Sequence, residues 1–268
     1  DVNKAKSAAI AVEILHNFTL LHDDIMDQSP LRRGKETVYK KFNSNKAILS
    51  GDTMFALSYK HLLNYDKEII KDLVEILTQS SIEVCEGQAF DMEFETRNDV
   101  KIEEYINMIR LKTGVLLSCA LRLGAVTANC SKENLELLNE FALNIGIAFQ
   151  IQDDILDCWS DVEVFGKITG KDIIDNKKTF LYLKALEIGN QRQQNILQEL
   201  YSSKNFEPAQ KEQVVKSIYE DLKIKELAEK EMLHYHNLAI QSLEKIDIDN
   251  QRKENLRRFS EKLINRNK

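Results

Sequence analysis

The chain has 268 residues, of which 43% are hydrophobic, and its formal net charge is −6. This length can bury a sizeable core, and the acidic balance gives no reason to expect a nucleic-acid partner. No uncharged apolar stretch approaches the ~20 residues that span a bilayer, and no signal segment is recognisable. The four cysteines are scattered without CxxC pairing, which predicts reduced thiols and a cytoplasmic protein.

Apolar residues recur at helical spacing along most of the chain, which contains only two prolines and nine glycines. Helices are predicted over residues 4–27, 45–63, 67–94, 101–127, 133–158, 175–202, 207–219, 222–245 and 250–265. Residues 28–34 and 160–172 are predicted to be loops, and no run alternates strictly enough to predict a strand. The expected fold class is all-α, a bundle of long helices around a central site.

Several helix boundaries have recognisable signals. Asn98 or Asp99 is expected to cap the helix over 101–127, and Ser131 the helix over 133–158. Pro208 suits a first helical turn. The chain starts at Asp1 inside a helical pattern, so we expect one domain over residues 1–268 from which an N-terminal segment is missing.

Residues 23–34 read DDIMDQSPLRRG and combine acidic and basic side chains. Asp23 and Asp27 are four residues apart, so a helix places them on one face, and Asp24 widens the cluster. Oxygen ligands of this kind suit Mg²⁺, which fills its remaining positions with water and substrate phosphate. Arg32 and Arg33 follow, and guanidinium groups match phosphate oxygens two at a time.

A second acidic cluster, Asp153, Asp154 and Asp157, lies in the sequence FQIQDDILD and also precedes a basic loop. One such cluster is more often a solvated helix face. Two clusters, each at the end of an apolar helical run, favour a buried site, because unpaired carboxylates are costly to bury. Metal ions between them would neutralise a diphosphate and make it a good leaving group.

These motifs resemble the trans-isoprenyl diphosphate synthases, or polyprenyl synthetases. The matching stretches are HNFTLLHDDIMDxxxLRRG at 16–34, GQxxD at 87–91, LKTG at 111–114, FQxQDDxLD at 149–157, and GKxxGxD with KKT at 166–179. They occur in the family's order and cover most of the chain. The resemblance implies an isoprenoid synthase bundle of long helices around a central cavity, in a homodimer.

The resemblance also implies the activity: head-to-tail condensation of isopentenyl diphosphate with an allylic diphosphate. It implies three Mg²⁺ ions per active site, for which Mn²⁺ can substitute. Asp23, Asp27 and Asp153 are then the direct metal ligands, with an indirect contribution from Asp91. Asp24, Asp154 and Asp157 complete the two clusters through water or Lys/Arg contacts.

Substrate contacts follow from the same resemblance. Arg32 would hold the allylic diphosphate, and Arg33 with His16 would hold isopentenyl diphosphate. Lys112 and Thr113 would face the allylic diphosphate and the forming cation, although alone they suggest an ordinary amphipathic helix. The remaining expected substrate contacts are Gln88, Gln150, Lys167 and Lys177; Lys171 and Lys178 could be plain solvated lysines.

Product length would depend on the residues five, eight and eleven positions before Asp23, which are Phe18, Leu15 and Val12. They lie roughly 7, 12 and 16 Å down a helix from Asp23. In the family a bulky aromatic at the first of these positions closes the tunnel early, which favours a farnesyl or geranylgeranyl product, the latter somewhat ahead. Phe18 as plain core packing is the alternative.

Three other functions are weighed. A non-catalytic subunit of a heteromeric synthase typically loses aspartates, whereas both clusters are intact here. A ferritin-like di-iron protein would use two ExxH pairs, Glu13 with His16 and Glu231 with His234. A terpene cyclase normally has only one DDxxD.

The family's upstream Gly-Lys-Arg element is not found in the sequence. The basic residues 252–268 are expected to form a solvated helix or to cover the site.

Overall fold

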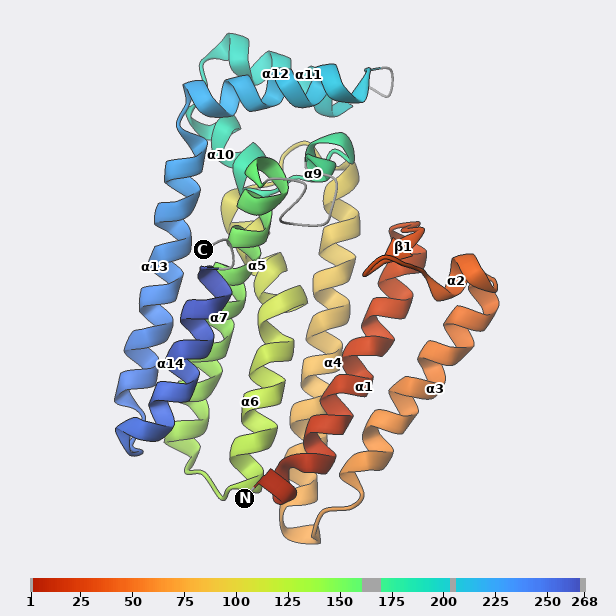
Figure 1. Cartoon of the computed structure of the whole chain (residues 1–268), viewed down its shortest axis with the longest axis vertical. Coiled ribbons are helices and arrows are strands. Elements are labelled where there is room, and N and C mark those ends of the chain that lie inside the picture. The colour runs from red at the N-terminus through yellow and green to blue at the C-terminus, as the bar shows by residue number, and fades with distance from the viewer. Residues whose placement is uncertain (1, 161–169, 203–205, 266–268) are drawn as a thin grey trace. The chain divides into compact units, whose positions relative to one another are not determined.

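The structure is a computed structural model that describes residues 2–160, 170–202 and 206–265. Nearly all of these residues are helical, which confirms the predicted all-α class (Figure 1). They group into two compact units: unit 1 comprises residues 1–85 and 115–139, and unit 2 comprises residues 86–114 and 140–268. Two long helices, α4 (Lys67–Thr96) and α7 (Lys132–Trp159), contribute residues to both. That the two units form a single domain stays a prediction.

Unit 1 contains the first aspartate cluster. Besides parts of α4 and α7, its elements are α1 (Val2–Met26), β1 (Leu31–Arg32), β2 (Lys35–Glu36), α2 (Val38–Lys41), α3 (Ser44–Leu62) and α6 (Val115–Thr127). Helix α1 lies along α3 and also contacts α6 (Figure 1). Ala8, Ala11 and Leu15 of α1 recur every three or four residues and are buried in its core, so helical periodicity decides which face of α1 is covered.

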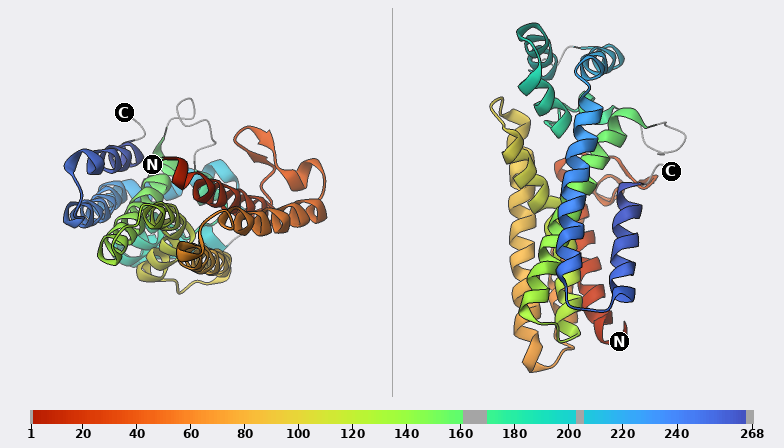
Figure 2. Two further views of the ribbon diagram at one scale, coloured as in Figure 1. Left: turned by 90° about the horizontal axis from the view of Figure 1, so that it is seen from below. Right: turned by 90° about the vertical axis from the view of Figure 1, so that its left-hand side faces the viewer.

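Unit 2 contains the second aspartate cluster. Its further elements are α5 (Ile102–Ile109), η1 (Arg110–Gly114), α9 (Lys171–Ile174), α10 (Phe180–Ile188), α11 (Gln191–Ser202), α12 (Pro208–Asp221), α13 (Ile224–Lys245) and α14 (Asn250–Ile264). Helix α14 folds back beside α13 (Figure 2). Lys253 donates to the Glu244 carbonyl at 2.8 Å and is buried. The basic C-terminal helix is therefore docked through one face rather than solvated on every side.

Three predicted boundaries were wrong. The stretch 101–127 is two α-helices separated by a π-helical turn, η1. The stretch 175–202 is α10 and α11, which separate at Gly189; Asn190 and Gln193 exchange side-chain to backbone hydrogen bonds there, a capping box that starts α11. The predicted loop 28–34 contains β1, which pairs antiparallel with β2, although no strand was predicted.

Of the predicted caps, two are confirmed and one is wrong. Ser131 accepts a hydrogen bond from the Asn134 amide at 3.2 Å, and Pro208 stands in the first turn of α12. Helix α5 begins at Ile102 with Lys101 in the N-cap position, and the Lys101 amide donates to Glu104 at 2.9 Å. Asp99 pairs with Arg97 at 3.0 Å, so its carboxylate is used outside the helix. Within the described residues, no helix is long and apolar enough to cross a membrane.

Candidate active site

The first aspartate cluster stands at the carboxyl end of α1. Asp23 and Asp24 lie in its last turn, and the Asp27 amide continues the helical pattern with a 2.8 Å bond to the Asp23 carbonyl. Arg32 bridges two carboxylates: Nε donates to Asp24 at 2.7 Å and Nη2 to Asp23 at 3.0 Å. Asp24 is buried, and burial raises its pKa although Arg32 opposes the rise. One guanidinium thus relieves the repulsion within the cluster.

A tight hairpin positions the two arginines. Leu31 pairs with Glu36 and Arg32 with Lys35, which leaves Arg33 and Gly34 as the two-residue loop. Both have positive φ, 52° and 73°, as a type I′ hairpin turn requires, and Gly34 takes that conformation without cost. The turn directs Arg32 back to the aspartates and leaves Arg33 exposed.

His16 lies about two turns before the aspartates on α1 and is half-buried. Burial lowers its pKa, and the nearby charges of Arg33 and Arg32 lower it further, against an opposing effect of Glu13. The imidazole is therefore neutral near pH 7, with one nitrogen able to donate a hydrogen bond. Unit 1 brings His16, Arg32 and Arg33 into one electrostatic environment, as the sequence predicts.

The second aspartate cluster is held on α7. Asp154 is buried and accepts hydrogen bonds from the Tyr105 hydroxyl and from Gln150 Nε2, the latter at 3.3 Å. Burial, and next the charge of Asp172, raises the pKa of Asp154 well above its usual value. Sequence reasoning missed Tyr105, because a tyrosine on the apolar face of an amphipathic helix has the pattern of an ordinary core residue.

The π-helical turn η1 carries Lys112 and Thr113. Lys112 Nζ donates to Asp91 at 2.6 Å, and the Thr113 hydroxyl donates to Gln150 at 3.1 Å. A π turn changes the direction of side chains within a helix and often occurs at functional sites. Unit 2 therefore brings together four of the predicted residues, Lys112, Thr113, Asp91 and Gln150, and links them to Asp154.

Two glycines allow this close packing. A Cβ on Gly87 of α4 would meet the Lys112 backbone nitrogen at 2.4 Å, and one on Gly146 of α7 would meet the Gly114 Cα at 2.3 Å. Both obstacles are backbone atoms, which cannot rotate away. The two helices can therefore approach η1 closely enough for their polar side chains to reach Lys112 and Thr113.

The segment 170–177 completes the second cluster. The Asp172 amide donates to Asp157 Oδ2 at 3.0 Å, and the Gly170 amide donates to the Asp157 carbonyl at 2.6 Å. Burial, followed by the charge of Asp157, raises the pKa of Asp172 to about 7, while Lys177 opposes the rise. Asp172 belongs to the GKxxGxD motif, yet sequence reasoning gave it no role. Lys167 lies outside the described residues.

Lys171 and Lys178 were both predicted as possible solvated lysines, but only Lys171 is solvated. Lys171 is exposed and forms a 3.5 Å ion pair with Asp175. Lys178 is buried, and its ammonium donates to the carbonyls of Phe94 and Glu95 at 2.7 and 3.0 Å. These carbonyls belong to the last turn of α4, where a cation is favourable. The solvated alternative for Lys178 was therefore wrong.

The donor set can be tested against Mg²⁺. Among the described residues, no group of three His, Cys, Asp or Glu side chains is arranged to hold an ion unaided. Mg²⁺ does not need one, because it usually takes one or two carboxylates and completes its shell with water and phosphate oxygens. The Gln88 Nε2 atom is buried without a hydrogen-bond partner in the described part of the chain. The aspartates and this free donor fit a metal-bound, oxygen-rich ligand.

The three predicted chain-length residues have different surroundings. Leu15 is buried in the core of unit 1, and Val12 packs against the same core. Phe18 is half-buried and makes ring contacts with His22 and Phe55, at centroid distances of 4.7 and 5.2 Å. Phe18 thus packs against α3, and its role in product length stays a prediction.

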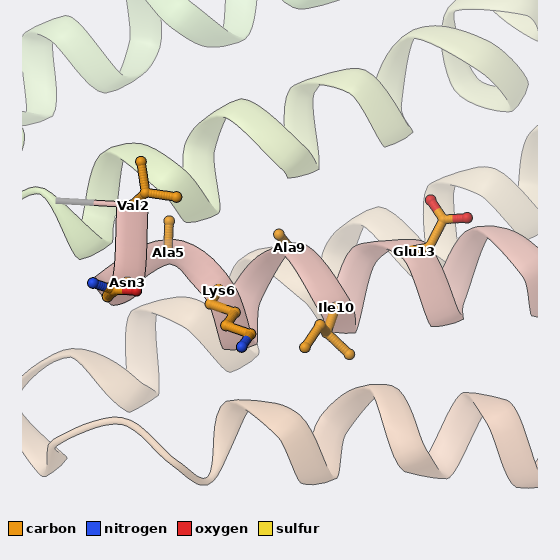
Figure 3. A pocket seen from close by; sticks show the side chains of 7 residues that line it. All are labelled: Val2, Asn3, Ala5, Lys6, Ala9, Ile10 and Glu13. Carbon is orange, nitrogen blue, oxygen red and sulfur yellow. The ribbon is translucent and has the colours of Figure 1, made fainter.

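A shallow, mostly apolar hollow of about 490 Å³ follows the first half of α1 (Figure 3). Its lining residues all belong to this helix: Val2, Asn3, Ala5, Lys6, Ala9, Ile10 and Glu13. Glu13 is ten residues before Asp23, or roughly 15 Å along the helix axis. The hollow is therefore separate from the aspartate cluster of unit 1.

Comparison with known proteins places this geometry in context. The family model described as polyprenyl synthetase matches residues 1–222. The short chain isoprenyl diphosphate synthase of Methanocaldococcus jannaschii is 42% identical over 224 residues, covering 83% of this chain and 67% of the relative. The geranylfarnesyl diphosphate synthase of Natronomonas pharaonis is 40% identical over 185 residues, covering 68% of this chain and 54% of the relative. The chain thus spans about half to two thirds of the length of these relatives.

Among solved structures, a crystal structure of a geranylgeranyl pyrophosphate synthase matches with a TM-score of 0.94 and 43% sequence identity. The match covers 98% of this chain and 81% of that chain. The predicted fold class is confirmed, because the structural neighbours are isoprenyl synthases with an all-α fold.

Proposed function

Because the chain belongs to the polyprenyl synthetase family, we propose that it is a Mg²⁺-dependent prenyltransferase. Its reaction would be the condensation of isopentenyl diphosphate with dimethylallyl, geranyl or farnesyl diphosphate to a short trans-prenyl diphosphate and diphosphate. One observation carries the proposal: each aspartate cluster is hydrogen-bonded to a side chain expected to contact substrate. Arg32 bonds Asp23 and Asp24 in unit 1, and in unit 2 Gln150 bonds both Thr113 and Asp154, beside the pair of Lys112 with Asp91.

The first step is ionisation of the allylic substrate. Asp23, Asp27 and Asp153 would hold Mg²⁺, which would supply the positive charge that makes diphosphate a good leaving group; the diphosphate departs with the bonding electrons. Arg32 would bind the diphosphate oxygens from unit 1. In unit 2, the hydroxyl of Thr113 and the amide oxygen of Gln150 present partial negative charge, which favours a nearby allylic cation.

The second step forms the new carbon–carbon bond. The double bond of isopentenyl diphosphate attacks the allylic cation, and the released diphosphate accepts the proton that is then lost. Arg33 and neutral His16 would hold the second diphosphate, one by charge and the other by a single hydrogen bond. No side chain has to act as a nucleophile, so the main tasks of the protein are electrostatic stabilisation and exclusion of water.

The finer features of this activity are proposals of the same kind. The site would hold three Mg²⁺ ions, for which Mn²⁺ can substitute, and the enzyme would be a cytoplasmic homodimer. The product would be farnesyl or geranylgeranyl diphosphate, with the second favoured, and Phe18 would close the tunnel. Gln88, Asp91, Gln150, Lys167 and Lys177 would complete the diphosphate site, and Asp154 and Asp157 would orient the second cluster.

The alternatives have weaker support. Both clusters are complete, which disfavours a non-catalytic subunit and a terpene cyclase. In a di-iron protein, Glu13 and Glu231 would be ligands, but Glu13 accepts a hydrogen bond from Asn17 at 2.8 Å on an exposed surface. The family membership also leaves the di-iron alternative without support.

The test is an assay with Mg²⁺, radiolabelled isopentenyl diphosphate and each of the three allylic diphosphates in turn. A labelled prenyl diphosphate that requires both substrates is the expected result. Asp153→Ala should lower turnover by about two orders of magnitude or more, as second-sphere changes alone cost 10–100-fold. If the folded protein forms no product with any of the three allylic diphosphates, the proposed prenyltransferase activity is refuted.

A further inference from the structure

The ammonium group of Lys211 is buried, and within the described part of the chain no carboxylate forms an ion pair with it. Lys211 is 4% exposed and lies in the first turns of α12. Its Nζ donates to Asn176 Oδ1 and, at 3.4 Å, to the Ile174 carbonyl, and it lies 4.8 Å from the centre of the Tyr201 ring. Burying an ammonium is costly when its hydrogen-bond acceptors are neutral, and the charge of Asp175 offsets only part of that cost. The burial of the Lys211 ammonium is therefore explained by the backbone and side-chain oxygens that it binds.

Lys211 holds the end of the segment 170–177. Ile174 is the last residue of α9, so the ammonium meets the carbonyl end of that helix, where a cation is favourable. Asn176 has a φ of 60°, a left-handed conformation that asparagine adopts more readily than most residues, and its side chain accepts the Lys211 hydrogen bond from this turn. Helix α12 also approaches the start of the segment, since a Cβ on Gly170 would meet the Glu212 carboxyl carbon at 2.5 Å.

The same segment holds the second aspartate cluster from the other side. The amide of Asp172 donates to the Asp157 carboxylate at 3.0 Å, and the amide of Lys177 donates to the Asp172 carbonyl at 2.9 Å. A continuous set of hydrogen bonds therefore runs from Lys211 through Asn176 and α9 to Asp157. A displacement of the turn at Asn176 would move both the Asp157 contact and the backbone of Lys177.

We propose that Lys211 is a positioning residue that ties α12 to the segment 170–177 and so fixes Asp157 and Lys177 for diphosphate binding. This inference rests on the proposed function for its kinetic consequence, whereas the structural tie stands on the contacts alone. Lys211 itself touches neither the aspartates nor a substrate group. Its effect is on the placement of residues that do.

Two variants test the tie, and a third is the control. Lys211→Met keeps the length of the side chain and removes its donors and charge. Asn176→Gly removes the acceptor and tolerates the positive φ at that position. Gln213→Met changes an exposed polar residue of the same helix to the same apolar one, and it should leave exchange and kinetics unchanged.

The first readout is hydrogen–deuterium exchange by mass spectrometry on peptides that cover 170–177. Faster exchange is expected there in Lys211→Met and Asn176→Gly, by about tenfold. No loss of melting temperature is expected for Lys211→Met, because replacing a buried charge by an apolar group is often neutral or stabilising. Unchanged exchange in 170–177 would overturn the tie, whether or not the protein has prenyltransferase activity.

The second readout is steady-state kinetics with the allylic diphosphate. Because the segment orients binding groups, both variants should raise its KM by about 10-fold to 100-fold. The double variant should be no worse than either single one, since both remove the same contact. Faster exchange with an unchanged KM, or additive effects, would overturn the role in positioning. A wild-type protein without product would refute the proposed function and leave the exchange result to decide the tie.

Discussion

The carboxyl groups of the second aspartate cluster lie in two environments. Asp154 is buried, bonded to Tyr105 and Gln150, and has a pKa raised well above its usual value. Asp153 is only half-buried. An enclosed carboxyl whose oxygens already accept hydrogen bonds is suited to orienting its neighbours, whereas a more accessible one is suited to binding a cation. The roles of Asp153 as direct ligand and of Asp154 in completing the cluster stay predictions.

The carboxyl of Asp172 should make the metal-free protein less stable as the pH rises. Its pKa is about 7 in the folded state, against an ordinary value of 3.8. Between these values the folded protein keeps a proton that the unfolded chain loses, so stability present below the lower value is lost as the pH approaches the higher one. In EDTA, the melting temperature of the wild type should therefore fall more steeply between about pH 4 and about pH 7 than that of Asp172→Asn.

The matched control for this pH effect is Asp175→Asn, on the same segment. The Asp175 side chain is 42% exposed and pairs with Lys171, so its removal should leave the slope of the wild type nearly unchanged. Equal slopes for Asp172→Asn and the wild type would show that the Asp172 carboxyl ionises normally.

Phe18 links core packing with the expected product length. Its ring contacts His22 and Phe55, so Phe18→Ala should cost stability, by about 3 kcal/mol for a large aromatic that is partly buried. If Phe18 also closes the tunnel, the same variant should form longer products, with Leu15 as the next barrier. Mass spectrometry of the hydrolysed products and a thermal melt measure the two effects. A lower melting temperature with an unchanged product distribution would assign Phe18 to packing alone.

At the scale of elements, the approach of α7 to η1 depends on the absence of a side chain. Gly146→Ala would place a Cβ 2.3 Å from the Gly114 backbone, so α7 or the π turn must shift. We expect a loss of about 1–3 kcal/mol in the free energy of unfolding, as in other overpacked cores. The displacement would also lengthen the hydrogen bond from Thr113 to Gln150, and turnover should fall with it.

Gly124→Ala is the control for that variant. Gly124 also lies inside a helix, α6, but a Cβ there would have nothing within 4 Å. Alanine is the better helix former, so this change should stabilise the protein by up to about 1 kcal/mol. Denaturant unfolding of both variants measures the difference. Equal effects of the two substitutions on the free energy of unfolding would show that Gly146 is not required for the close approach of α7 to η1.

The long helices could be predicted from the sequence because their apolar spacing is regular and sustained. The interruptions could not, because each depends on a local interaction. The π turn at residues 110–114 has no signal in hydrophobic periodicity, and the break after α10 depends on the reciprocal bonds of Asn190 and Gln193. The same limit applies to the site: motifs identified the aspartates and Lys112, whereas Tyr105 and Lys211 emerge only from tertiary contacts.

At the scale of the whole molecule, α3 carries apolar side chains on its exposed surface. The side chains of Ile48, Leu49 and Leu57 are 40%, 66% and 38% exposed. Several large apolar side chains exposed on one helix often mark an interaction surface. A second copy of the chain would cover such a surface in the proposed homodimer, and the apolar residues would then form its interface core. The surface should therefore be sensitive to an added charge.

Leu49→Glu should convert a dimer to a monomer, because a carboxylate in an apolar interface loses its hydration without gaining a partner. Leu233→Glu on α13 is the control. Leu233 is exposed too, at 46%, but it lies in unit 2 rather than on α3. Sedimentation velocity over a range of protein concentrations gives the mass of each species. The expected result is a dimer for the wild type and for Leu233→Glu, and a monomer for Leu49→Glu. A wild-type monomer at all concentrations would refute the homodimer, and a dimer that survives Leu49→Glu would place the interface away from α3.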